Sequence, residues 1–494
     1  MNPWQHIAVL SRQEIKQLQD RRLHRFINEY IYPFSPYYKR LFDEHKIDPK
    51  KIKRVEDLKH IPFTSKINLI DRDESTQHYK DFILQPDEHK IRAAWPPAKT
   101  LPLVLKKILH GKEAVSHQMS REFMPVFMTY TTGTTNKPTP FLYSNYDIEN
   151  LYSSGARMMN LFDVRKDEKV LNLFPYAPHL AFWQVVFGGF AACNLVLSTG
   201  GGKTVGTEGN IKALIKMQPS LVIGVPSYVY HVLRVAKEQN CKLEFVKKVV
   251  LGASKVTFGF KQKLAELLNL MGAKDVSIFG TYGFTEARCA WAESPTRLDE
   301  SSGYHLYPDK EIMEVVDPKT GEIKGEGEDG ELVYTSLDAR ASCVLRYRTG
   351  DFVKGGVVYE RCPHRNWFIP RISSDISRLN DVKDLQLSKV KGALVNLNHF
   401  DEVLSQEKEI DEWQIEICKK NNDPYDVDEL ILYICPKNGA DQNRLQDSVK
   451  RMMVAATEVA PNAVKFISMP EMVERLQIEV ANKEKRILDT RPKG

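Results

Sequence analysis

The sequence has few cysteines and no pair of them spaced as C-x-x-C. Seven cysteines are scattered through 494 residues, an odd number with no regular spacing. This usage indicates reduced thiols, as in a cytoplasmic protein, and argues against a disulfide-rich secreted one. The N-terminus also lacks the apolar core of a signal peptide.

A strong excess of one charge is also missing. Seventy Lys and Arg residues oppose 64 Asp and Glu residues, for a net charge of +6. No Lys/Arg-rich block indicates nucleic-acid binding, so a nucleic-acid partner is not expected. Residues 1–60 hold 13 basic and 8 acidic residues, which a solvated helix surface explains better than an anionic partner does.

Only one long uncharged run is present, Val170–Gly202. By length alone it reaches the size of a membrane-spanning segment. Pro175, Pro178, His179 and Asn194 interrupt it, and it divides into a strand, a helix and a strand. We therefore expect a buried β–α–β unit and no membrane span.

What the sequence does contain is an alternation of strand and helix patterns. The strands are short and apolar and are bounded by Gly, Pro or Asn, as buried parallel strands are. The predicted strands are Val170–Phe174, Leu195–Leu197, Leu221–Gly224, Val249–Leu251 and Val276–Phe279, with helices Ala181–Ala192, Asn210–Met217, Tyr228–Glu238 and Phe260–Leu270 between them. This alternation predicts a doubly wound α/β sheet whose ligands bind beyond the carboxyl ends of the strands.

The pattern changes before and after this region. Residues 1–80 are charged and helical in pattern (Arg12–Tyr30, Pro36–His45), and residues 85–120 are less regular. Strand candidates beyond residue 303 are Glu311–Val316, Glu331–Thr335 and Phe352–Tyr359; later ones are Trp413–Cys418, Leu430–Cys435 and Ala463–Ser468, with a helix at Gln442–Glu458. The chain is too long for one core. We predict the α/β class, with a large N-terminal domain (1–378) of doubly wound sheets plus a β subdomain, and a small α+β C-terminal domain (379–494).

One polar stretch stands out, Tyr130-Thr131-Thr132-Gly133-Thr134-Thr135-Asn136-Lys137. Glycine allows the backbone to turn and bring its N–H groups to a ligand, while the hydroxyls and the lysine add donors and positive charge. The composition is that of a phosphate cradle, although the second glycine and the Gly-Lys-[Ser/Thr] ending of a Walker A loop are missing. A polar hairpin turn is the alternative interpretation.

Three further motifs carry weaker signals. Phe279–Glu286 follows a predicted strand, so Tyr282 could stack on a base, Thr285 donate to a phosphate and Glu286 hold Mg²⁺. The alternative is an ordinary strand-to-helix turn with a capping Thr and Glu. Leu345–Asp351 offers an Asp for ribose hydroxyls, or Arg–Asp pairs around a β-turn. Ala481–Asp489 offers a lysine on a mobile element to a transferring phosphoryl group, or is a disordered basic terminus.

In order and spacing these motifs together resemble the phenylacetate–CoA ligase family of the adenylate-forming acyl/aryl-CoA synthetase superfamily. The resemblance runs from about Tyr37 to the C-terminus. It includes Ile61-Pro62-Phe63-Thr64-Ser65-Lys66, the threonine stretch, Gly200–Thr204, Val225–Tyr228, Tyr282–Glu286, Gly321–Thr335 and Arg346–Asp351.

The resemblance implies a role for each matched residue. ATP phosphates would be held by Thr131, Thr132, Gly133, Thr134, Thr135 and Lys137, and the adenine pocket would be lined by Gly252, Ala253 and Ser254 with Tyr282 stacked on the base. Thr285 would contact the α-phosphate, Glu286 would bind Mg²⁺, and Asp351 with Arg378 would hold the ribose. Lys483 would be the catalytic lysine, with Lys485 as the fallback, and His179 a gate to the acyl pocket.

The acyl pocket itself is the least specific part of the pattern. Its candidate lining residues are Phe174, Tyr176, Phe182, Trp183, Tyr228 and Gly280, each of which is equally an ordinary core position. An aryl acid is the family default, and a fatty or alicyclic acid stays open.

The sequence departs from the family at two places. Ser377-Arg378-Leu379-Asn380-Asp381 and a delayed Lys391-Gly392 replace the usual Gly-Arg-x-Asp-Asp and Arg-Gly, which puts the hinge in question. Ser294 replaces one cysteine of a zinc site found in some relatives, and Cys362-Pro363-His364 is half of such a site, so zinc is not expected. Cys289 and Cys343 are expected to be buried thiols.

The resemblance implies an enzyme that uses ATP and Mg²⁺ to convert a small carboxylic acid into an acyl adenylate and then passes the acyl group to a thiol, with coenzyme A as the expected acceptor. Three alternatives stay open: transfer to an acyl carrier protein or another protein thiol, adenylation without transfer, and a degenerate nucleotide-binding scaffold. A homodimer also stays open, because relatives are often dimers.

Overall fold

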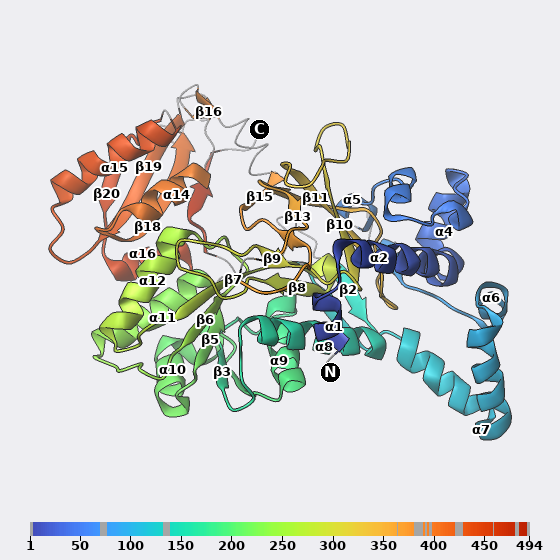
Figure 1. The fold of residues 1–494 in the computed structure, drawn as a ribbon. Coiled ribbons are helices and arrows are strands. Elements are labelled where there is room, and N and C mark those ends of the chain that lie inside the picture. The colour runs from blue at the N-terminus through green and yellow to red at the C-terminus, as the bar shows by residue number, and fades with distance from the viewer. Residues whose placement is uncertain are drawn as a thin grey trace.

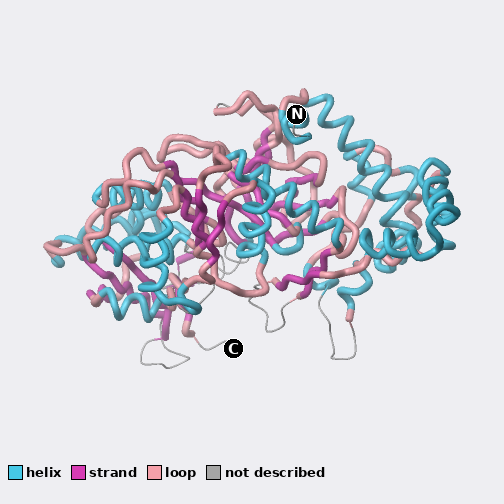
Figure 2. Tube along the Cα trace, turned by 90° about the horizontal axis from the view of Figure 1, so that it is seen from below, coloured by secondary structure: helices cyan, strands magenta, loops and turns pink. Residues whose placement is uncertain are grey.

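The computed structural model describes residues 3–69, 77–131, 139–362, 364–379, 389–390, 393–394, 398–419, 428–457, 459–479 and 484–491. Figure 1 shows the N-terminal helices at one end of the molecule and the C-terminal sheet at the other, with the largest sheet between them. The view turned by 90° in Figure 2 agrees, because helices and loops make up the end of the molecule opposite the C-terminal sheet.

Helices form the first part of the chain. They are α1 (Pro3–Ala8), α2 (Arg12–Phe26), the π-helix η1 (Ile27–Ile31), α3 (Tyr32–Phe34), α4 (Pro36–Glu44), η2 (Pro49–Lys51), η3 (Val55–His60), α5 (Lys66–Leu69), η4 (His78–Phe82), α6 (Glu88–Ala94) and α7 (Pro97–Phe123). Helix α2 begins at a capping box in which the Ser11 and Glu14 side chains satisfy each other's backbone N–H groups. The helices predicted at Arg12–Tyr30 and Pro36–His45 are confirmed, the first by α2 with η1 and the second by α4.

The prediction that residues 85–120 are irregular is wrong, because α6 and α7 occupy most of this segment. Three prolines disguise the helical pattern: Pro96 is the N-cap of α7 and Pro97 its first residue, where proline is well tolerated, whereas Pro102 lies inside the helix. Gly111, at φ 82°, divides α7 into two helical halves. The halves contact each other where Lys106 Nζ donates to Gln118 Oε1 at 2.7 Å.

The central sheet has nine strands in the order β13-β14-β9-β8-β7-β6-β5-β3-β4. Strands β3 (Lys169–Asn172), β4 (Leu195–Ser198), β5 (Leu221–Gly224), β6 (Lys248–Leu251) and β7 (Ser277–Phe284) are parallel to one another, while β8 (Cys289–Ala292), β9 (Tyr304–His305), β13 (Val357–Val358) and β14 (Arg371–Ile372) extend the sheet antiparallel. The connecting helices are α8 (Asn145–Leu161), α9 (Leu180–Ala192), α10 (Gly202–Met217), α11 (Pro226–Glu238) and α12 (Phe258–Leu270). The predicted alternation, including the β3–α9–β4 unit of the uncharged run, is confirmed.

Two smaller sheets complete the first 378 residues. A hairpin of β1 (Phe127–Tyr130) and β2 (Pro140–Tyr143) flanks the threonine stretch. A four-stranded antiparallel sheet has the order β10 (Glu311–Val316), β11 (Gly330–Ser336), β12 (Tyr347–Val353) and β15 (Ile376–Arg378). The predicted single strand Phe352–Tyr359 is wrong, because β12 ends at Val353 and β13 belongs to a different sheet.

The C-terminal residues form a separate sheet in the order β20 (Ala463–Phe466), β19 (Asp428–Pro436), β18 (Ile410–Lys419) and β21 (Ile487–Asp489). A short pair, β16 (Lys389–Val390) and β17 (Ala393–Leu394), precedes it, and α14 (Asn398–Gln406), α15 (Gln442–Thr457) and α16 (Met469–Leu476) accompany it. The α+β character predicted for this region is confirmed.

Three large apolar cores match these parts. One joins the N-terminal helices to the β10–β12 sheet, one surrounds the parallel strands, and one lies inside the C-terminal sheet. Met472 and Leu476 of α16 belong to the core of the parallel strands. Lys263 of α12 donates to the Ile410 carbonyl at 2.9 Å. The C-terminal sheet is therefore docked against α11 and α12, beside the carboxyl ends of the parallel strands.

A search for membrane-spanning segments among the described residues finds no helix that is both long and apolar enough to cross a bilayer.

Candidate active site

The backbone carbonyl of Tyr130 is a meeting point of three segments. His179 Nδ1 lies 3.1 Å from it and Thr285 Oγ1 donates to it at 3.5 Å. The Tyr130 N–H in turn donates to the Pro178 carbonyl at 2.7 Å. Tyr130 is the last residue of β1, so the base of the threonine stretch is held against the loop before α9 and the turn after β7.

Residues 132–138 lie outside the described residues, and the predicted phosphate ligands Thr132, Gly133, Thr134, Thr135 and Lys137 with them. The residues on either side are described. The Thr131 N–H donates to the Thr139 carbonyl at 3.0 Å, and Thr131 Oγ1 accepts from the Thr139 N–H at 3.0 Å. Thr131 therefore closes the neck of the hairpin.

Tyr282, Asp351 and Arg378 form a hydrogen-bonded cluster. The Tyr282 hydroxyl donates to Asp351 Oδ2 at 2.7 Å, and Arg378 Nε lies 3.1 Å from Asp351 Oδ1. Burial and the Asp351 charge raise the pKa of Tyr282 well above its usual value, so its hydroxyl keeps the proton. The Tyr282 ring also stacks on Trp291, with centroids 5.7 Å apart.

The sequence motifs suggested that Tyr282 and Asp351 lie in turns, but both lie in strands. Tyr282 lies inside β7, which continues through the motif, and Asp351 lies inside β12. A register shift in β12 and the positive φ of Gly350 (73°) interrupt the ladder just before Asp351. Such a bulge re-aims a side chain, and here the side chain is Asp351.

Glu286 lies in η5 (Thr285–Ala287), directly after β7. Its Oε1 accepts from the Tyr347 hydroxyl at 2.7 Å. Burial raises the pKa of Glu286, while the Tyr347 hydrogen bond and the Arg378 charge oppose that rise. Sequence reasoning missed Tyr347, although it lies in the same Arg346–Asp351 motif as the ribose candidate.

Gly252, Ala253 and Ser254 follow β6, beside β7 in the sheet. A Cβ placed on Gly252 would lie 2.3 Å from Thr281 Oγ1, so no larger residue fits there. Thr281 Oγ1 donates to the Leu251 carbonyl at 3.0 Å. The predicted adenine loop and the predicted adenine-stacking strand are thus adjacent at the carboxyl ends of the parallel strands.

Three of the predicted acyl-pocket residues cluster at the start of α9. The Tyr176 and Phe182 rings are 5.3 Å apart, and Trp183 lies 6.1 Å from Tyr176 and 5.3 Å from Phe182. Tyr176 is 64% exposed and Phe182 is buried. His179 lies on the same loop, so this aromatic cluster adjoins the Tyr130 meeting point.

A cavity of about 20 Å³ lies between the loop after β4, the start of α11 and the C-terminal segment. It is lined by Leu173, Pro175, Gly201, Gly202, Lys203, Val225, Ser227, Tyr228, Ile478, Glu479 and Glu484. Tyr228, predicted for the acyl pocket, receives a hydrogen bond of 2.8 Å from Asn210 Nδ2. Burial raises the pKa of Glu484, while the Arg486 charge lowers it.

Lys483 lies outside the described residues. The described residues that flank it in sequence, Glu479 and Glu484, both line this cavity. Glu479 Oε1 accepts from Thr207 Oγ1 at 2.7 Å, which holds this end of the C-terminal segment to α10. Lys485, the fallback lysine, is tied by its backbone, with its N–H donating to the Leu476 carbonyl at 3.2 Å.

The remaining acyl-pocket candidates are Phe174 and Gly280. Phe174 is buried, and its ring tip is 3.4 Å from a Cβ placed on Gly252. A Cβ on Gly280 would lie 3.0 Å from Glu293 Oε2, which also pairs with Lys261 at 2.8 Å. The Lys261–Glu293 pair is fully buried behind Gly280, and no motif in the sequence marked it.

Ser294, which replaces a cysteine of the zinc site of some relatives, lies beside Cys362, with Oγ 3.8 Å from Sγ. Among the described residues, no group of three or more His, Cys, Asp or Glu side chains could hold a metal ion. Cys289 and Cys343 are buried, as predicted.

The profile of the family described as AMP-binding enzyme matches residues 39–337. Phenylacetate-coenzyme A ligase of Thermus thermophilus is 29% identical over 358 residues, which are 72% of this chain and 68% of that protein. Phenylacetate-coenzyme A ligase of Escherichia coli is 24% identical over 354 residues, 70% of this chain and 69% of that protein.

Among solved structures, 2-hydroxyisobutyryl-CoA ligase in its postadenylation state with R3-HIB-AMP has a TM-score of 0.74 at 18% identity, covering 99% of this chain and 92% of that one. The same ligase with 2-HIB-AMP and CoA in the thioesterification state has a TM-score of 0.62 at 18% identity, covering 98% and 91%. The fold is thus shared over nearly the whole chain.

Proposed function

Because this chain belongs to the AMP-binding enzyme family, we propose that it is an ATP-dependent acid–thiol ligase. It converts a carboxylic acid into an acyl adenylate and transfers the acyl group to coenzyme A. The phenylacetate-coenzyme A ligase relatives confirm the resemblance drawn from the sequence motifs. They support an aryl or other apolar acid as the substrate.

The observation that carries the proposal is the Tyr130 carbonyl contact. His179 from the aromatic loop and Thr285 from the end of β7 both contact the carbonyl of Tyr130, the first residue of the threonine stretch. An acyl group at the aromatic cluster and a triphosphate at the threonine stretch would therefore be neighbours. Adenylation needs this proximity, because the reaction joins two anions.

The residues of the chain would then divide the work of binding ATP. Tyr282 and the loop Gly252–Ser254 would enclose the adenine, and Asp351 would accept hydrogen bonds from the ribose hydroxyls. The threonine stretch, with Lys137, would donate to the phosphates, and Thr285 would turn its single hydroxyl proton from the Tyr130 carbonyl to the α-phosphate. In the first step a carboxylate oxygen bonds to the α-phosphorus and the bond to the pyrophosphate breaks.

Glu286 is the proposed Mg²⁺ ligand. Its Oε1 accepts from Tyr347, and Mg²⁺ is commonly bound by one or two carboxylates together with substrate phosphates. The carboxylate of Glu286 fits that preference. When bound, the cation would neutralise phosphate charge.

Residues 1–378 and 379–494 are proposed as the two domains, with the hinge near Arg378. Lys483 would neutralise the developing charge during adenylation. For the second step, a thiol sulfur bonds to the acyl carbon and AMP leaves. Rotation of the smaller domain would withdraw Lys483 before that step, which requires the Thr207–Glu479 hydrogen bond to break.

The test is to incubate the protein with ATP, Mg²⁺ and a panel of aryl, alicyclic and fatty acids, with and without CoA, and to identify the products by mass spectrometry. An acyl-CoA together with AMP and pyrophosphate is expected. The Asp351→Ala variant is the matched control, because it should lose ATP-dependent product formation while the fold is retained.

Other outcomes would assign the protein elsewhere. Product formed only with an acyl carrier protein would replace CoA as the acceptor. Acyl adenylate released in the presence of CoA would indicate adenylation alone. ATP binding without pyrophosphate exchange across the whole panel would reject the ligase proposal in favour of a nucleotide-binding scaffold. Light scattering of the purified protein tests whether it forms a homodimer.

A further inference from the structure

The first half of α7 carries an aliphatic stripe on its outer surface. The stripe consists of Leu101, Val104, Leu105, Ile108 and Leu109, which are 59%, 50%, 50%, 73% and 73% exposed. Spacings of three and four residues place these side chains on one face of a helix. Figure 1 shows α6 and α7 extending away from the sheets, on the same side of the molecule as α4.

The orientation of this half-helix is the reverse of an ordinary surface helix, which buries its apolar face. Leu103, on the opposite side, packs against the N-terminal core. Lys106 contacts Gln118 in the second half of α7, and Lys107 Nζ lies 3.4 Å from Glu88 Oε1 in α6. The polar face is thus turned toward the protein's own helices, and the stripe is turned away from them.

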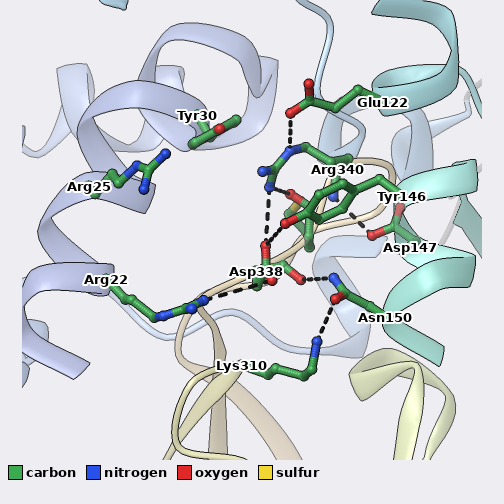
Figure 3. A network of polar contacts seen from close by, with 12 residues as sticks. Arg22, Arg25, Tyr30, Glu122, Tyr146, Asp147, Asn150, Lys310, Asp338 and Arg340 are labelled. Atoms are coloured by element: carbon green, nitrogen blue, oxygen red, sulfur yellow. Dashed lines mark hydrogen bonds and ion pairs between the residues drawn. The ribbon is translucent and has the colours of Figure 1, made fainter. Parts of the chain in front are cut away.

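The whole of α7, with the aliphatic stripe in its first half, is held to the rest of the protein at both ends. At its start, Lys99 Nζ donates to the Tyr30 hydroxyl at 2.8 Å. At its end, Phe123 is buried and Glu122 accepts from Arg340 Nε at 2.7 Å. Figure 3 shows this second anchor, where Arg340 also approaches Tyr30, Tyr146 and Asp338.

Charge decides which partner fits the stripe. Residues 85–121 contain seven Lys and Arg residues against three Asp and Glu residues, and Pro97–Lys112 contains four lysines and no acidic residue. A second copy of the same helix would bring like charges together, whereas an anionic surface would attract them. Aliphatic side chains on one face with lysines around the other are the pattern of helices that lie in a membrane interface.

We propose that the first half of α7 is a peripheral membrane-binding element that inserts the aliphatic stripe into the interface of a bilayer containing anionic lipids. The lysines of Pro97–Lys112 supply the positive charge that attracts this segment to anionic headgroups. This inference rests on the exposed surface of α7 and is independent of the proposed ligase activity.

The test is flotation of the full-length protein with phosphatidylcholine vesicles and with vesicles that also contain phosphatidylglycerol. We expect binding to the anionic vesicles at low salt and a several-fold loss of binding as the salt concentration rises. The double variant Ile108→Ser/Leu109→Ser should bind at least tenfold more weakly. The matched control is Leu195→Ser/Leu270→Ser, which removes two side chains exposed to 63% and 64% elsewhere and should bind as the wild type does.

Thermal unfolding of each variant checks that the fold is intact. The proposal is overturned if the wild type does not float with anionic vesicles at low salt, or if both double variants bind equally. It is also overturned if light scattering shows a dimer that the Ile108→Ser/Leu109→Ser variant alone loses, because the stripe would then be an interface between copies of this chain.

Discussion

The Tyr282 hydroxyl donates a 2.7 Å hydrogen bond to Asp351, although 69 residues separate the two in the chain. The other oxygen of Asp351 is 3.1 Å from Arg378 Nε. The carboxylate that would accept from ribose hydroxyls is therefore oriented from two sides before ATP arrives. Such preorganisation lowers the cost of binding.

Replacing Tyr282 by Phe should weaken ATP binding while leaving the ring that would stack on adenine. We expect the KM for ATP to rise about tenfold, because a hydrogen bond to a charged group contributes roughly 1.5 kcal/mol. Pyrophosphate exchange at varied ATP concentration measures this change. Tyr32→Phe is the control, because it removes a Tyr–Asp hydrogen bond of 2.9 Å on the N-terminal helices. An equal rise of the KM for ATP in this variant would contradict the assignment of Tyr282 to the ATP site.

The Tyr347 hydroxyl should tune the protonation of Glu286. Its hydrogen bond lowers the pKa of a carboxyl that burial raises, so in Tyr347→Phe the pKa of Glu286 moves further up. The acid limb of the kcat/KM profile should shift to higher pH, and added Mg²⁺ should partly restore the activity at low pH. An unchanged acid limb would show that Glu286 does not limit the reaction.

The buried pair Asp147–Arg288 should contribute strongly to stability. Asp147 accepts from Arg288 at 2.8 Å and also from the backbone N–H groups of Arg340 and Ala341. Asp147→Asn leaves the Arg288 charge buried without its counter-ion, and we expect a loss of about 3 kcal/mol in urea unfolding.

The exposed pair Arg165–Asp167 provides the control for that measurement. Asp167→Asn should leave the free energy of unfolding essentially unchanged, because solvent screens an exposed ion pair. Similar losses at the two sites would mean that burial does not set the strength of the Asp147 interaction.

Glu311 should make stability fall as pH rises. Burial raises the pKa of Glu311 to about 8. Its Oε1 accepts from Trp291 Nε1 at 2.7 Å, whereas its Oε2 has no hydrogen-bond partner in the described part of the protein. The folded state therefore keeps a proton that the unfolded state releases near pH 4.5.

The contribution of the Glu311 carboxyl to the free energy of unfolding is therefore complete below pH 4.5. It is lost as the pH rises to about 8. Each unit of pKa shift corresponds to about 1.4 kcal/mol, so the loss reaches at most roughly 5 kcal/mol. Glu311→Gln should remove this slope and be more stable than the wild type at pH 8. Parallel stability curves for the two proteins would contradict the raised pKa.

Lys483→Ala should abolish adenylation but leave thiolysis of a supplied acyl adenylate largely intact. The reason is that Lys483 would neutralise charge only in the first step. Lys485→Ala is the control, because the structure shows that the backbone of Lys485 is tied to α16. Survival of both half-reactions in Lys483→Ala would show that another residue acts as the catalytic lysine.

Local patterning predicted the elements of the parallel sheet closely. Strand β5 and the helix α9 differ from their predicted bounds by at most one residue. Boundaries failed where tertiary packing extends an element past a turn signal. The predicted strand Val276–Phe279 stops before Gly280, yet pairing with β8 carries β7 to Phe284. The prolines of α7 hid a helix that its contacts with the N-terminal core support.

The amino-acid sequence by itself determined the strands and helices of the parallel sheet, because periodicity is a local property. It also determined which motifs the chain carries and in what order. Only the tertiary structure decided that Tyr282, Asp351 and Arg378 meet, that Thr285 and His179 share the Tyr130 carbonyl, and that the α7 stripe faces outward. These relationships join residues far apart in the chain, and sheet order and helix docking bring such residues together.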